Sequence, residues 1–139
     1  MKKIILCFFL AMSFSLPKLN LTYAQNAAVP LTATIDLDEA GLKQALEDNN
    51  FRFYLNDLNE EQLNALKQNS LYYEKNFTVE INTEKKDKKT ECKIVFMNKE
   101  ALGKKILYRY FVANAINNVV FNGSPLSSDD FFNKYIYVQ

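Results

Sequence analysis

Few residues in this 139-residue chain could carry chemistry, and histidine is missing altogether. Without an imidazole, the sequence excludes Ser-His-Asp and Cys-His catalysis, histidine-ligated zinc and a histidine-based pH switch. Three glycines are too few to build a glycine-rich phosphate loop, and no GxGxxG or P-loop motif occurs. The common sets of catalytic and nucleotide-binding residues are therefore not present in the sequence.

Two cysteines remain as candidate nucleophiles or soft-metal ligands. Cys7 lies in an apolar run near the start of the chain, and removal of that run would leave Cys92 alone. One thiol forms neither an internal disulfide nor a thiolate cluster. Because Cys92 alternates with Ile94 and Phe96, we predict a buried, inert thiol, with an intermolecular disulfide or a reactive thiol as the alternatives.

Three pairs of carboxylates lie close enough in sequence to be considered as general acids and bases or as calcium ligands: Asp36 with Asp38, Glu60 with Glu61, and Asp129 with Asp130. Each pair stands at the predicted start of a helix, where a negative side chain stabilises the helix dipole. No EF-hand-like alternation of oxygen ligands follows any pair. We therefore predict no catalytic residues, no metal site and no cofactor.

The start of the chain predicts export. Two lysines precede an apolar run over residues 4–16, which has about the length of a signal-peptide core and is too short to span a bilayer, for which about 20 residues are needed. Thr22 and Ala24 supply the small residues of a cleavage site, so we expect a signal peptide over residues 1–24. The mature chain is then expected to be periplasmic or secreted, with no stable membrane span.

Cleavage would make the chain slightly acidic. The whole chain has 17 basic and 16 acidic residues, and loss of Lys2, Lys3 and Lys18 would reduce the basic residues to 14. The resulting net charge of about −2 gives no global attraction to nucleic acid or to an anionic membrane. The roughly 115 residues left are enough for one domain with a single core.

The hydrophobic pattern predicts the elements that position these residues. Apolar alternation indicates strands over residues 51–55, 77–82, 90–97 and 119–122. Helical periodicity indicates helices over 59–73 and 99–117, the first capped by Asn59 with Gln62 and the second by Asn98. The order of elements is therefore βαββαβ.

Two segments flank this unit. Residues 25–50 predict a leader, then a short strand or extended arm, then a short helix opened by a capping-box-like pair of Asp36 and Glu39. Residues 124–139 predict a capped turn of helix and a final strand over 135–138. Because this tail is rich in aromatic residues, we expect it to dock on its own domain or on a partner.

Right-handed βαβ crossovers place both helices on one face of a four-stranded antiparallel sheet. This is the ferredoxin-like two-layer sandwich, an α+β fold, over residues 51–123. The order and spacing of its elements resemble heavy-metal-associated domains, including a β-rich segment after the second helix, here residues 115–120. That family binds its metal through a Cys-x-x-Cys pair in the loop after the first strand, where residues 56–59 of this chain read NDLN. The resemblance therefore implies the fold, and the metal chemistry does not carry over.

The sheet face away from the helices is the candidate interaction surface. We expect it to present Arg52, Tyr54, Thr78, Glu80, Lys93, Val95, Met97 and Val120. RNA-recognition domains share this topology, but the third predicted strand supplies no second stacking aromatic beside Tyr54. The face also carries a mixed apolar patch of Tyr54, Val95, Met97 and Val120. Such a patch favours contact with another protein, or cover by the aromatic tail, over RNA binding.

These observations predict an exported, non-enzymatic binding domain. Its expected partner is a protein of the envelope or a second copy of the chain, bound through the open sheet face. The alternative is a degenerate metal-handling domain similar to the heavy-metal-associated family. No nucleic-acid partner is expected.

Overall fold

A computed structural model describes residues 29–84, 88–97 and 101–137 of the chain. The predicted signal peptide and the predicted helix cap Asn98 lie outside these residues. The elements run in the order β1 (Leu31–Ile35), α1 (Glu39–Glu47), β2 (Asn50–Asn56), α2 (Glu60–Tyr72), β3 (Phe77–Thr83), β4 (Lys89–Phe96), α3 (Ala101–Ala113), β5 (Ile116–Phe121), β6 (Ser124–Ser127), α4 (Ser128–Phe131) and a π-helical turn over Phe132–Ile136. Within the described part of the chain, none of the helices has both the length and the apolar character needed to cross a membrane.

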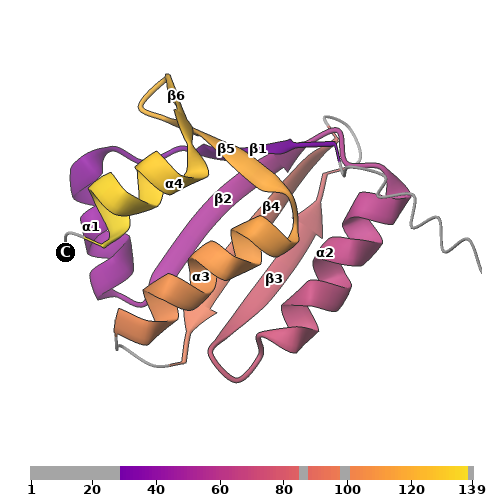
Figure 1. The fold of residues 1–139 in the computed structure, drawn as a ribbon, viewed down its shortest axis with the longest axis horizontal. Coiled ribbons are helices and arrows are strands. Elements are labelled where there is room, and N and C mark those ends of the chain that lie inside the picture. The colour runs from indigo at the N-terminus through magenta and orange to yellow at the C-terminus, as the bar shows by residue number, and fades with distance from the viewer. Residues whose placement is uncertain (1–28, 85–87, 98–100, 138–139) are drawn as a thin grey trace, which may run out of the picture.

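One six-stranded sheet runs through the molecule in the order β3-β4-β2-β1-β5-β6 (Figure 1). Strands β1 and β5 are parallel, and every other neighbouring pair is antiparallel. The prediction of a four-stranded antiparallel ferredoxin-like sheet with two helices is therefore wrong. The predicted strands and helices of the βαββαβ unit do form, but the sheet that they build is larger and mixed.

The insertion of β1 accounts for this difference. A ferredoxin-like sheet would place β5 directly beside β2, whereas here β1 lies between them. Thr34 pairs with Tyr54 of β2 on one side and with Val120 of β5 on the other. The segment that we predicted as a short strand or an extended arm is therefore an interior strand of the sheet, with Ala33 and Ile35 buried.

Side-chain caps fix where the helices begin. Asn59 accepts a hydrogen bond from the Gln62 N–H at 2.8 Å, and the Gln62 side chain accepts one from the Asn59 N–H at 3.0 Å, so the predicted capping box is confirmed. Helix α1 is capped by Asp38, which accepts from the Gly41 N–H at 2.7 Å, and not by Asp36 as predicted. Ser127 caps α4.

Helix α3 ends at Ala113 and β5 begins at Ile116, both earlier than predicted. The Asn114 side chain donates a hydrogen bond to the Tyr110 carbonyl at 2.8 Å, which satisfies an acceptor at the end of the helix. Ala115 then adopts a positive φ of 53° and turns the chain into β5. Asn117 and Asn118, where we expected the helix to end, lie within the strand.

All four helices contribute to a single core on one face of the sheet. The inward residues of β2 and β4 are almost fully buried, as their alternation predicted: Phe51, Phe53, Leu55, Cys92, Ile94 and Phe96. Figure 1 shows α3 crossing this face, with α1 and α2 toward its two sides. The prediction of a buried Cys92 thiol is confirmed.

The C-terminal segment packs into this same core. Phe131 and Phe132 are fully buried, with ring centroids 5.4 Å from Phe121 and 5.1 Å from Phe111, respectively. Ser128 anchors the segment by donating to the Ile116 carbonyl at 2.6 Å. The aromatic residues therefore pack on the helix side of the sheet and leave the opposite face uncovered. Residues 132–136 form a helical turn, so the final strand predicted over 135–138 is wrong where the structure describes it.

Candidate functional site

The helices of the described residues pack on one face of the sheet, and they leave the opposite face uncovered (Figure 1). Strand alternation brings Arg52, Tyr54, Lys93, Val95 and Val120 to this face, as predicted, together with Thr78 and Glu80. Met97 follows the end of β4 and is 64% exposed. We call this surface the open face.

Cross-strand ion pairs cover the β3–β4–β2 half of the open face. Lys93 Nζ lies 3.4 Å from Glu80 Oε2, and Arg52 Nη1 lies 3.3 Å from Glu91 Oε1. The register places Lys93 directly between Glu80 on β3 and Arg52 on β2. The charges alternate in sign along β4, through Lys89, Glu91 and Lys93, whereas across the strands Lys93 lies opposite a second cation, Arg52.

Tyr54 and Lys89 extend this network toward β1. The Tyr54 hydroxyl lies 3.4 Å from Glu91 Oε1, and Lys89 Nζ lies 3.8 Å from the centre of the Tyr54 ring, within the range of a cation–π interaction. Lys89 Nζ also lies 3.3 Å from Asp36 Oδ2. Asp36 is thus an ion-pair partner on the edge of the open face.

The paired residues carry three positive charges (Arg52, Lys89 and Lys93) and three negative charges (Asp36, Glu80 and Glu91). A surface with balanced, paired charges does not attract a polyanion as a continuous basic patch would. Each exposed pair contributes only about 0.2–1 kcal/mol to stability. The charged groups can therefore exchange their present partners for those of a binding protein at little cost.

The apolar residues predicted for this face do not form one patch. Val95 lies on β4 opposite Thr78 and Asn50, whereas Val120 lies on β5 opposite Thr34 and Pro125. Strands β2 and β1 separate the two valines, which places them at least about 14 Å apart at the usual strand spacing. The open face is therefore predominantly polar, with separate apolar residues.

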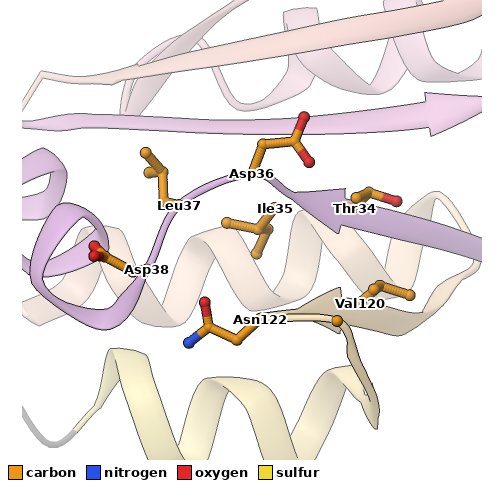
Figure 2. Close-up of a pocket in the computed structure, with 8 residues that line it drawn as sticks. Thr34, Ile35, Asp36, Leu37, Asp38, Val120 and Asn122 are labelled. Atoms are coloured by element: carbon orange, nitrogen blue, oxygen red, sulfur yellow. The ribbon is translucent and has the colours of Figure 1, made fainter.

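Two hollows flank the Thr34–Val120 pair, where β1 and β5 run parallel. The first has a volume of about 410 Å³ and lies at the carboxyl ends of the two strands, between the β1–α1 segment and the β5–β6 turn (Figure 2). The second has a volume of about 560 Å³ and is lined by hydroxyl and amide side chains that include Thr32, Asn56 and Asn59. Both are lined by Thr34 and Val120, so together they form a shallow depression that we call the β1–β5 groove.

Two of the three carboxylate pairs lie at helix starts as expected, and in the third pair Asp38 caps α1 while Asp36 forms an ion pair with Lys89. Glu60 and Glu61 occupy the first turn of α2, and Asp129 and Asp130 that of α4. Among the described residues, no three His, Cys, Asp or Glu side chains are arranged to hold a metal ion. Burial, followed by the charge of neighbouring Glu91, raises the pKa of Cys92 to about 12. The thiol is therefore neutral at physiological pH and has no contact with solvent.

Sequence reasoning missed the other members of the open face. Glu91 and Lys89 share the alternation of Lys93, so the period of two in β4 was a sufficient signal for both. Thr32 and Thr34 of the groove could not be placed in this way, because their position depends on the pairing of β1 with β2 and β5. Asp36 likewise joins the face only through that pairing.

The chain was compared with protein-family models, with curated protein sequences and with solved structures. None of them matches it. The functional argument therefore rests on the geometry of the open face.

Proposed function

We propose that this chain is an exported binding domain that contacts another protein through the open face of its sheet, with the β1–β5 groove at the centre of the contact. The observation that carries this proposal is the uncovered face itself. All four helices and the aromatic C-terminal segment pack on the opposite side, within the part of the chain that the structure describes.

The chemistry of the face favours a protein over other partners. Three cations are each paired with an anion, which supports pairing with a partner of mixed charge and gives no continuous site for a phosphate backbone. The groove adds hydroxyl and amide groups, which suit hydrogen bonds to polar side chains or to peptide groups. Val120 and Tyr54 lie among these charged and polar groups and provide separate apolar contacts.

Site-specific photo-crosslinking in the native host tests the proposal. A photo-reactive amino acid at Thr32, in the groove, should trap one defined protein, whereas the same group at Val112, 57% exposed on α3, should not. The trapped protein is then purified and its affinity measured by calorimetry. Thr32→Arg should weaken binding at least about tenfold by filling the groove, and the control Val112→Arg should leave it unchanged. Equal trapping at both positions, or equal affinity of both variants, contradicts the proposal.

Export is tested separately by the mass of the protein recovered from the medium or the periplasm. We expect a mature chain that begins at Gln25. Recovery of the full-length chain from the cytoplasm would refute this part of the proposal. The metal-handling alternative has no supporting observation in the described residues.

A further inference from the structure

The two edges of the sheet are not equally protected against further strand pairing. The β6 edge has four residues and contains Pro125, which has no N–H to donate. The β3 edge has seven residues, Phe77–Thr83, with no proline, and among the strands of the described residues it pairs only with β4. A long, regular edge strand presents a row of backbone donors and acceptors that can pair with another strand.

The apolar side of β3 also lacks a neighbour. On the interior strand β2, the inward residues Phe51, Phe53 and Leu55 are fully buried, whereas on β3 only Phe77 is. Val79 and Ile81 pack on the core but remain partly exposed. A further strand beside β3 would complete their burial.

Helix α2 carries an exposed apolar residue above the same edge. Asn69 donates its side-chain amide to Asn114 and to the Ala113 carbonyl at 3.0 and 3.3 Å, so this side of α2 faces α3. Leu71 is two positions further on, which places it about 200° round the helix axis, on the flank that points away from α3. It is 63% exposed. Figure 1 shows α2 beside β3 at this margin of the molecule.

The residues of β3 decide which strand fits there. Residues that lie directly opposite in an antiparallel pair point to the same face, so a symmetric pair of β3 strands can be centred on Val79, Glu80 or Ile81. Centring on Glu80 would bring two carboxylates face to face. Centring on Val79 places Glu80 of one copy opposite the Thr78 hydroxyl of the other, and Phe77 of one copy opposite Ile81 of the other.

Centring on Ile81 is less favourable than centring on Val79. It would place Val79 of one copy opposite Thr83 of the other, and it would hold the two α2 helices further apart than centring on Val79 does. Tyr73 at the end of α2 stacks on Phe77, with ring centroids 5.7 Å apart, so the end of α2 that carries Leu71 lies beside the start of β3. The register centred on Val79 therefore brings the two Leu71 side chains toward each other across the symmetry axis.

We propose that two copies of this chain associate through their β3 edges, antiparallel and centred on Val79, with the two α2 helices in contact at Leu71. The result is one sheet continuous across both copies, with a doubled open face on one side. This interface is separate from the groove and does not rest on the function proposed for it.

Disulfide trapping tests the register. In a Cys7→Ser background, Cys92 is buried and protonated, so an introduced cysteine is the one reactive thiol of the folded protein. Under mild oxidation Val79→Cys should form a covalent dimer at least about tenfold faster than Glu80→Cys. In the proposed register, Cα atoms of paired Val79 residues lie within disulfide range, whereas those of Glu80 are about 7–8 Å apart. Faster trapping through Glu80→Cys overturns the register.

Sedimentation of the purified protein tests the association without an introduced cysteine. We expect a dimer whose Kd rises at least about tenfold with either Leu71→Asp or Thr78→Glu. Leu71→Asp places two carboxylates across the symmetry axis, and Thr78→Glu places one opposite Glu80 of the other copy. Thr32→Arg should leave the dimer intact. A monomer at about 100 µM, far above a typical Kd for a stable dimer, overturns the proposal. A dimer broken by Thr32→Arg and unaffected by Thr78→Glu also overturns it, and assigns self-association to the open face.

Discussion

The Ser70 and Tyr110 hydroxyls lie 2.9 Å apart in the core and join α2 to α3. Ser70 donates its own proton to the Leu66 carbonyl at 2.7 Å, so Tyr110 is the donor in this pair. Burial is the main reason that the pKa of Tyr110 is raised, and the phenol therefore stays neutral. This hydrogen bond is a buried polar contact between the two helices, next to the edge-to-face contact of Tyr73 with Tyr110.

Removing both partners of this pair should cost less than the sum of the two single removals. Ser70→Ala leaves the buried Tyr110 hydroxyl without its acceptor and should lower the free energy of unfolding by about 1–3 kcal/mol. Tyr110→Phe should cost about 1 kcal/mol, and the double variant less than the sum of the two. Urea denaturation measures all three, with Tyr72→Phe, 83% exposed, as a control of near-zero effect. Strict additivity would show that the two hydroxyls do not interact.

The buried thiol should make stability fall in alkaline solution. The pKa of Cys92 is raised from 9.0 to about 12 on folding, so above pH 9 the unfolded chain loses a proton that the folded protein keeps. The contribution of the Cys92 thiol to the free energy of unfolding is therefore complete below pH 9 and is lost as the pH rises toward 12. The loss amounts to at most about 1.4 kcal/mol per pH unit. Denaturant midpoints at pH 8, 9 and 10 should show this decline, and Cys92→Ala should flatten it. An equal decline in Cys92→Ala would assign it to other groups.

The aromatic end of the chain should be essential to the fold. Phe132 is fully buried against Phe111 and Tyr108, so Phe132→Ala should cost about 3–5 kcal/mol. Val112→Ala, at an exposed position, should change stability by no more than about 0.5 kcal/mol. Thermal unfolding followed by circular dichroism compares the two. An unchanged melting temperature after removal of residues 124–139 would contradict the packing described for them.

Metal titration separates the binding proposal from the metal-handling alternative. Residues 56–59, at the end of β2 and in the loop that follows it, have no thiol or imidazole, and Cys92 lies in the core. We therefore expect no stoichiometric binding of Cu(I) or Zn(II) in competition with a chelator of about micromolar affinity. Calorimetry of the purified Cys7→Ser protein measures this. Tight binding of one equivalent would favour the alternative.

Local signals predicted the elements of this fold well. The capping box of Asn59 with Gln62 and the alternation of Phe51 with Phe53 involve residues a few positions apart, so the sequence alone specifies them. The same is true of the buried Cys92. These predictions needed no knowledge of which strands are neighbours.

The arrangement of the sheet could not be predicted in this way. The five residues of β1 read equally well as an arm or as a strand, and their place beside β5 depends on a partner far along the chain. The error propagated to the site, because Thr32, Thr34 and Asp36 reach the open face only through β1. It also led us to expect one apolar patch, whereas β2 and β1 in fact separate Val95 from Val120.

The parallel pairing of β1 with β5 also constrains the order in which the molecule can assemble. Leu31 pairs with Ile116, 85 positions later, so the middle of the sheet stays incomplete until β5 has been synthesised. Contacts that close so long a loop form late, because they carry a large entropic cost. For a chain that we propose is exported, this delay keeps the nascent polypeptide loose enough to be threaded through a translocation channel before it folds.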